Sequence, residues 1–458
     1  MIGSNRDKSI LQGPFGWRGI QPGAKRRRSK RSFLGTIFLL TVLPMIWILI
    51  GHRITGGDSN SPAGGSLSKI DTPASTLQPI AKSDVQKMLN GVRFADLDRK
   101  YIDVEYLGQP YRVETSLDLS LQQYLEKKLD TLNSRYIGIV ALDPDTGRVL
   151  SMIGYNKKDS SNNPCLDNRY PAASIFKIIT AAAAIETLGL GADSELTYSG
   201  NKHTLYKSQL KDRKGRGTRK ITLKDSFAQS VNPVFGKIGA RQLGKPLLEK
   251  YADAFGFNRS IDFELPLTPS QVSVSDEPFQ CAEIASGFNR GTTLSPVHGA
   301  LIAGIVLNQG RLIEPTIVEK VTDRNGGTIY RGHSEALNQA VTPAASDVIY
   351  EIMRATIRSG TSRKAFRGYQ KDRILSKLIM GGKTGSINND AQDARFDWFV
   401  GFAEEREGSK RLAISVVVAH EKYIGIRASQ YARMAFRHYF GNYFEEQATA
   451  SGKTRRSS

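Results

Sequence analysis

Cysteine and histidine are scarce in this chain of 458 residues, with two and six copies respectively. Two thiols, Cys165 and Cys281, are too few for a disulfide framework, and we expect both to be buried and unpaired. No histidine stands in a recognisable serine-hydrolase motif, and a G-x-S-x-G nucleophile elbow is absent. The sequence therefore argues against a disulfide-built scaffold and a histidine-dependent serine hydrolase. It indicates no metal and no cofactor.

Acidic residues are also few, because 44 Asp and Glu stand against 64 Lys and Arg and leave a net charge of +20. Residues 1–32 hold nine Lys or Arg against Asp7 alone, a net charge of +8 within a short segment. A basic balance of this size favours either nucleic acid or an anionic membrane surface as a partner.

The run that follows this basic segment decides between the two partners. Residues 33–51 contain no charge, and as a helix they span roughly 28 Å, close to the thickness of the hydrocarbon core of a bilayer. We therefore expect a single transmembrane anchor and no nucleic-acid partner. The positive flank predicts that residues 1–32 form a cytoplasmic tail and that residues 52–458 lie outside the cytoplasm. A cleaved signal peptide or a buried core helix is the alternative.

Composition divides the remainder of the chain. Residues 52–82 are rich in Gly, Ser, Pro and Thr and predict a flexible linker. A small module is expected at 83–114, a large domain at 115–444 and a disordered tail at 445–458.

Short β-prone runs lie near both ends of the large domain, at 137–142 and 149–153 and again at 397–402 and 412–419. The sequence between them is mostly helical. We therefore predict an α+β domain, an α/β sandwich in which one antiparallel sheet of about five strands is covered by helices on both sides. The prediction includes an all-helical subdomain, and the transmembrane helix precedes the domain.

Three short motifs occur in order along this domain. They are Ser174-Ile175-Phe176-Lys177, Ser230-Val231-Asn232 and Lys383-Thr384-Gly385-Ser386. S-x-x-K recurs at Ser66, Ser199 and Ser208, in the linker or in polar stretches, whereas K-T-G is unique. Of the four S-x-x-K copies, only the one at Ser174 opens an apolar segment, which we predict to be a helix from about Ser174 to Leu188.

The alternative interpretation is that Ser174 is an ordinary helix cap and Lys177 an ordinary surface lysine. The chemistry of the pair argues against it. Three residues along a helix place both side chains on one face. Lys177 is flanked by apolar residues, and burial together with a neighbouring cation such as Lys383 lowers the pKa of a lysine. A neutral Lys177 accepts the hydroxyl proton of Ser174 and activates it as a nucleophile.

The third motif combines glycines that allow close approach of a ligand backbone with polar side chains that suit a carboxylate. Lys383, Thr384 and Ser386 offer one positive charge and two hydroxyls. An ordinary glycine-rich strand end is the alternative, and a phosphate loop is excluded because G-x-x-x-x-G-K-[ST] is not matched.

The ordered triple resembles the transpeptidase domain of penicillin-binding proteins, the enzymes that cross-link bacterial peptidoglycan. The resemblance covers roughly residues 114–440 and extends to Glu114–Gln122, Ala141–Gly147 and Asp397–Phe402. It also includes Ala285–Phe288 and Ser359–Thr361.

The resemblance implies a serine D,D-transpeptidase that acts through an acyl-enzyme. Ser174 then attacks the bond between two terminal D-alanines of a stem peptide, with Lys177 as base. It further implies that Ser230 relays a proton and that Asn232 binds a substrate amide. Binding of the terminal carboxylate is implied for Lys383, Thr384, Gly385 and Ser386. The backbone N–H groups of Ser174 and Ser386 are implied to form an oxyanion hole.

The same resemblance leaves other functions open. A D,D-carboxypeptidase or serine β-lactamase differs in how well water attacks the acyl-enzyme, and a β-lactam sensor or catalytically idle scaffold belongs to another class. It implies stem peptides as substrates, β-lactams as covalent inhibitors and the bacterial inner membrane as location. A glycan-polymerising partner is implied because the chain before residue 115 is too short for that domain. The basic stretch Lys202–Lys224 contacts an anionic lipid or wall polymer or, as we favour, forms a solvated loop.

Overall fold

The computed structural model describes residues 80–454 except 213, 214 and 216. The predicted cytoplasmic tail, the anchor and nearly all of the linker lie outside these residues. Within the described part of the chain, no helix combines the length and the apolar character that crossing a membrane requires.

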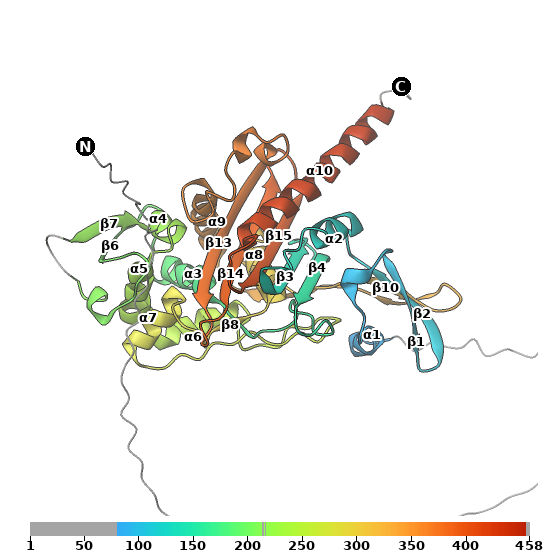
Figure 1. Cartoon of the computed structure of the whole chain (residues 1–458), viewed down its shortest axis with the longest axis horizontal. Helices are drawn as coiled ribbons and strands as arrows, with labels where there is room; N and C mark the ends of the chain where they lie inside the picture. The colour runs from blue at the N-terminus through green and yellow to red at the C-terminus, as the bar shows by residue number, and fades with distance from the viewer. Residues whose placement is uncertain (1–79, 213–214, 216, 455–458) are drawn as a thin grey trace, which may run out of the picture. The chain divides into compact units, whose positions relative to one another are not determined.

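A five-stranded antiparallel sheet forms the centre of the fold (Figure 1). Its strands, in spatial order, are β13 (Leu378–Asn388), β14 (Arg395–Glu405), β15 (Arg411–His420), β3 (Ser134–Leu142) and β4 (Val149–Asn156). The sheet confirms the predicted architecture. Because β13 is an edge strand, the K-T-G motif lies at a border of the sheet.

Helices cover both faces of this sheet, and the residues of β15 show why. Ile414 and Val416 are buried in a cluster with Tyr431 and Phe436 of α10 (Ala428–Thr454). Val417 faces the opposite cluster, to which α8 (Pro296–Leu307) contributes. A strand buried on both faces is apolar at successive positions, which is the pattern that the sequence displays here.

The region that carries the first two motifs is mainly helical. It contains α3 (Lys177–Leu188), α4 (Leu223–Ala228), α5 (Asn232–Lys237), α6 (Gly244–Ala254), α7 (Pro278–Ser286) and α9 (Pro343–Arg358). The prediction of an all-helical subdomain is wrong in one respect, because β6 (Glu195–Ser199) and β7 (Thr218–Thr222) form an antiparallel hairpin. The basic stretch 202–224 occupies the loop and second strand of this hairpin and the first residues of α4, and Arg219 and Lys220 of the strand are both exposed.

A second sheet contains the N-terminal segment. Its order is β1 (Tyr101–Tyr106), β2 (Gln109–Thr115), β10 (Val318–Thr322) and β11 (Thr328–Arg331). The module expected at 83–114, which also includes α1 (Lys82–Met88), therefore shares a sheet with residues 318–331. Long-range strand pairing of this kind leaves no local pattern in the sequence.

The C-terminal prediction is wrong for residues 445–454, which continue α10 as far as Thr454 and do not form a disordered tail. The helix is already nucleated by its buried N-terminal half, and Glu, Gln and Ala extend a formed helix at little cost. The two cysteines agree with expectation, since Cys165 and Cys281 are both buried and free.

Candidate active site

Ser174 lies in a 3₁₀ turn, η2 (Ala173–Phe176), that leads directly into α3. The predicted α-helix therefore begins three residues later than expected, at Lys177. Ala172 is the N-cap residue of this turn, and no side chain accepts a capping hydrogen bond there, so the Ser174 hydroxyl is not used as a helix cap. This geometry removes the interpretation of Ser174 as an ordinary capping serine.

Three oxygen atoms surround the amine of Lys177, whose side chain is fully buried. Nζ lies 2.9 Å from Ser174 Oγ and 2.7 Å from Asn232 Oδ1, and it also contacts the backbone oxygen of Ser286. Two of these atoms, the amide oxygen and the carbonyl, only accept hydrogen bonds. A neutral amine therefore donates its two protons to Asn232 and Ser286, and its lone pair remains for the proton of Ser174.

A second lysine–serine pair faces the first across the cleft. Lys383, also fully buried, donates to Ser230 Oγ at 3.0 Å and to the backbone oxygen of Thr384 at 2.8 Å. Ser230 adopts a left-handed backbone conformation with φ 55°, which is unfavourable for a non-glycine residue. The strained backbone at Ser230 holds its hydroxyl against Lys383 and is retained as part of the site.

Burial and charge lower the pKa values of the two lysines. Burial first, and then the positive charge of Lys383, lower the pKa of Lys177 well below its ordinary value. Burial also lowers the pKa of Lys383, to about 7. Desolvation disfavours each ammonium, and two adjacent cations repel, so one lysine is favoured as the neutral amine near pH 7.

The strand β13 passes directly beside the nucleophile. A Cβ atom built on Gly385 meets Ala172 O, Ala173 Cβ and Ile175 Cγ1 at 3.3 Å each, so the glycine allows this approach. Ser386 is exposed, and its hydroxyl accepts a hydrogen bond from Arg395 Nε at 2.8 Å. The structure therefore brings all three motifs together at one cleft, as the sequence predicted.

Several residues at the site carry no motif that points to them. Thr361 contacts Thr384 through their hydroxyls at 2.5 Å, and the Ser286 carbonyl contacts Lys177. The backbone oxygens of Lys202 and His203 accept from the backbone and side-chain N–H groups of Asn232, at 2.7 and 3.1 Å. Ser286 and Thr361 belong to segments singled out by resemblance, whereas Lys202 and His203 belong to the stretch expected to be a solvated loop.

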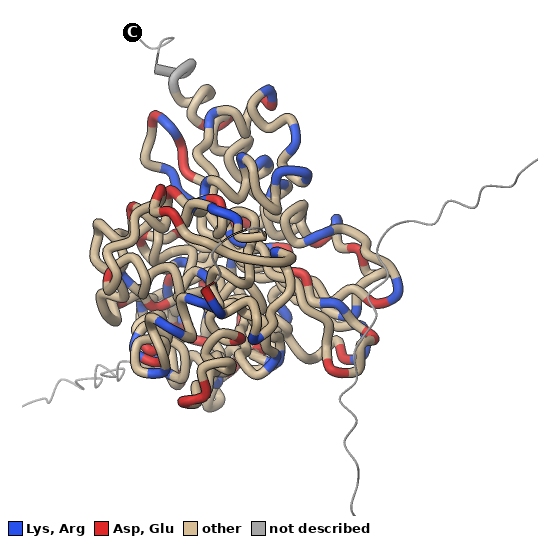
Figure 2. Tube along the Cα trace, turned by 90° about the vertical axis from the view of Figure 1, so that its left-hand side faces the viewer, with Lys and Arg blue, Asp and Glu red and all other residues tan. Residues whose placement is uncertain are grey.

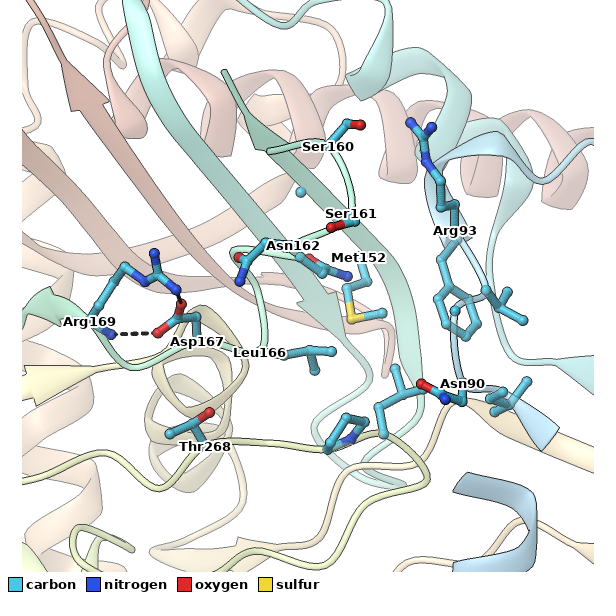
Figure 3. A pocket seen from close by; sticks show the side chains of 18 residues that line it. Asn90, Arg93, Met152, Ser160, Ser161, Asn162, Leu166, Asp167, Arg169 and Thr268 are labelled. Atoms are coloured by element: carbon cyan, nitrogen blue, oxygen red, sulfur yellow. Dashed lines mark hydrogen bonds and ion pairs between the residues drawn. The ribbon is translucent and has the colours of Figure 1, made fainter. Parts of the chain in front are cut away.

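A separate cavity of about 570 Å³ lies elsewhere, between the segment that follows α1 and strand β4 (Figure 3). Arg93, Met152, Leu166 and Arg169 are among its lining residues. It contains no residue of the three motifs and no paired nucleophile and base. We therefore assign the chemistry to the motif cleft. Among the described residues, no group of His, Cys, Asp and Glu is arranged to hold a metal ion.

A serine activated by a buried lysine defines a class of acyl-transferring enzymes that need no histidine and no metal. Residues 137–437 match the family described as "Penicillin binding protein transpeptidase domain". This match spans more than half of the chain, and the protein belongs to that family.

Curated relatives share this sequence at moderate identity. The chain is 26% identical over 334 residues to "Stage V sporulation protein D" of Bacillus subtilis, covering 68% of this chain and 50% of that protein. It is 26% identical over 314 residues to "Peptidoglycan D,D-transpeptidase PbpA" of Mycolicibacterium smegmatis, covering 61% of each. The chain thus spans about half to three fifths of the length of these relatives.

Solved structures share the fold. The penicillin G acyl-enzyme complex of penicillin-binding protein A from M. tuberculosis superposes with a TM-score of 0.56 at 20% identity. The alignment covers 71% of this chain and 79% of that one. The agreement in fold confirms the α+β assignment for the described domain.

Replacing Lys383 by Met is expected to stabilise the protein while it damages the site. The pKa of Lys383 is about 10.5 in the unfolded chain and about 7 when folded, so folding releases a proton and stability rises with pH between these values. At pH 7 this costs on the order of 4 kcal/mol. We predict that Lys383→Met raises the free energy of unfolding in urea at pH 7 by about 2–4 kcal/mol. Exposed Lys364→Met is the control, with no change expected, and a less stable Lys383→Met protein contradicts the prediction.

The same variant tests the coupling between the lysines. Acylation of Ser174 needs neutral Lys177, so its rate falls on the acid side as Lys177 becomes protonated. Removing the Lys383 charge raises the pKa of Lys177, and the acid limb of the pH–rate profile for acylation by penicillin then moves to higher pH. Stopped-flow rates from pH 5 to 9 measure this. An acid limb that stays in place, or moves down, shows that the two ammonium groups do not interact.

Proposed function

We propose that this protein is a serine D,D-transpeptidase that cross-links peptidoglycan stem peptides and is acylated by β-lactams. The observation that carries the proposal is the 2.9 Å contact between Lys177 Nζ and Ser174 Oγ, with both remaining donor sites of Lys177 satisfied by pure acceptors. The printed name of the PbpA relative and the penicillin G acyl-enzyme of the structural neighbour support the same activity.

The reaction proceeds in two steps. Ser174 gives its proton to Lys177 while its oxygen bonds to the carbonyl carbon of the penultimate D-alanine. The peptide C–N bond breaks, and the terminal D-alanine leaves with a proton relayed through Ser230. The amine of a second stem peptide then attacks the ester, and Ser174 recovers its proton.

The substrate is oriented by the remaining motif residues. Lys383, Thr384 and Ser386 bind the terminal carboxylate, Gly385 lets the peptide approach β13, and Asn232 binds a substrate amide. The backbone N–H groups of Ser174 and Ser386 stabilise the oxyanion. Arg395, which holds the Ser386 hydroxyl, joins the carboxylate-binding set.

Hydrolytic alternatives are disfavoured by the charges around Lys177. A carboxylate that activates water against the acyl-enzyme needs to lie close to the ester, where it raises the pKa of Lys177. In the described ranges, no carboxylate forms a hydrogen bond or ion pair with Ser174, Lys177 or Lys383. A D,D-carboxypeptidase or β-lactamase is therefore the second candidate.

Labelling with a fluorescent penicillin tests the function. The wild-type protein is expected to form a stable adduct, and Ser174→Ala is expected to form none. With a D-Ala-D-Ala peptide as donor and a second peptide as amine acceptor, wild type is expected to release D-alanine and form the cross-linked dimer, as mass spectrometry measures. Release of D-alanine without the dimer indicates a carboxypeptidase, and rapid loss of the penicillin label indicates a β-lactamase. Equal labelling of Ser174→Ala refutes the assignment of the nucleophile.

The proposal includes a location in the bacterial inner membrane. The charge-free segment 33–51 anchors the chain once, the basic segment 1–32 remains in the cytoplasm, and the catalytic domain acts outside, next to a glycan-polymerising partner. Alkaline phosphatase, which is active only outside the cytoplasm, tests the orientation when it is fused after Ser458 in bacteria. Strong phosphatase activity is expected in the membrane fraction, whereas an inactive fusion contradicts the orientation and a soluble active one contradicts the anchor.

A further inference from the structure

A dense group of positive charges lies between α9 and β13. Residues 354–377 contain eight Lys or Arg and a single acid, Asp372, which amounts to +7 of the net charge of +20. Seven of these basic side chains are exposed, and we call them the basic strip. They are Arg358, Arg363, Lys364, Arg367, Lys371, Arg373 and Lys377.

The charges of the basic strip are not neutralised by the protein. Within the described ranges, no carboxylate lies within 4.0 Å of these seven side chains, and Asp372 pairs with Arg437 of α10 at 3.0 Å. The basic stretch 202–224 is different, because Lys220 and Lys224 each pair with an acid at 2.7 and 2.8 Å. An uncompensated positive surface raises the local concentration of anionic ligands.

The segment that carries the strip is fixed in place. Phe366 and Leu375 are fully buried. Arg433 of α10 donates to the Ala365 carbonyl at 3.0 Å, and Arg406 donates to the Ser376 carbonyl at 3.0 Å. In Figure 2, Lys and Arg gather in the upper part of the view, close to the C-terminal helix. The basic residues therefore form a surface with a defined position.

The strip begins at the wall of the active site. The Thr361 hydroxyl bonds to that of Thr384 at 2.5 Å, and a Cβ on Gly360 meets the Ala228 carbonyl at 2.3 Å. At Gly360 and Thr361 the chain thus contacts both the end of α4, two residues before Ser230, and strand β13. Arg358 precedes this contact, and the other six residues of the basic strip follow it. A polymer whose end is bound in the cleft and that extends beyond Thr361 therefore lies along the basic strip.

We propose that the basic strip binds the carboxylates of peptidoglycan strands, so that the polymer is held beside the cleft while one of its stem peptides reacts. This inference rests on the proposed function for the identity of the polymer. Stem peptides carry free carboxylates. A polymer with one stem peptide bound in the cleft reaches the part of the basic strip next to Thr361 first. Anionic phospholipid is the other polyanion at a membrane, but nothing about it requires continuity with Thr361.

The proposal is tested with the full-length protein in detergent. Arg363, Lys364 and Arg367 are changed together to Gln, and Lys100, Lys127 and Arg324, three exposed basic residues outside the strip, are changed to Gln as a matched control. Binding is measured by co-sedimentation with purified peptidoglycan at low and moderate salt. We expect the strip variant to bind about tenfold more weakly at low salt, with a smaller difference at moderate salt, and the control to bind like wild type.

Two further measurements distinguish a failure of the strip proposal from a failure of the proposed function and from lipid binding. Labelling by fluorescent penicillin reports on Ser174 and needs no polymer, so it is expected to stay unchanged in the strip variant. Absent labelling in wild type refutes the proposed function independently of the strip. Flotation with phosphatidylglycerol vesicles against phosphatidylcholine vesicles tests the lipid alternative. Unchanged peptidoglycan binding overturns the proposal, and a loss confined to phosphatidylglycerol vesicles assigns the strip to the membrane.

Discussion

Two lysine side chains buried in one cleft are the constraint on which the rest of this structure depends. Lys177 and Lys383 are both removed from solvent, and neither has a carboxylate partner among the described residues. A buried ammonium is tolerated only when it is hydrogen-bonded or gives up its charge. The oxygens of Ser174, Asn232 and Ser286 around one lysine, and of Ser230 and Thr384 around the other, meet this requirement.

These requirements explain the arrangement of elements around the cleft. The oxygens come from η2, α7, α5, the turn before α5 and strand β13, so the sheet and the helical region must meet at one border. Stability and reactivity have the same origin here. The desolvation that makes Lys177 a base is the desolvation that opposes folding.

The sequence predicted the parts of the site that depend on local spacing. Ser174 and Lys177 lie one helical turn apart, and the glycine-rich run at Lys383 marks a strand that a ligand approaches, so pattern alone indicated both. The sheet was predictable for a similar reason, since strands such as β15 are short, apolar and bounded by polar loops. Pairing of β2 with β10 was not predictable, because nothing local records which distant strand lies alongside.

The missed contributors are backbone atoms or long-range neighbours. Ser286, Lys202 and His203 act through carbonyl oxygens, which every residue carries, and only the fold shows the contact of Thr361 with Thr384. The basic stretch 202–224 shows the same limit. Its composition indicated a solvated loop, yet the carbonyl oxygens of its first two residues accept hydrogen bonds from the backbone and side-chain N–H groups of Asn232.

Gly287 limits which substitutions the surroundings of Ser174 tolerate. Its φ is 63°, and a Cβ atom there meets the Ala173 carbonyl at 1.9 Å, immediately before the nucleophile. A side chain at this position therefore displaces the backbone that carries Ser174. The next residue, Phe288, is exposed and free of this conflict. Substitutions around the nucleophile are therefore expected at exposed positions such as Phe288, while position 287 keeps glycine.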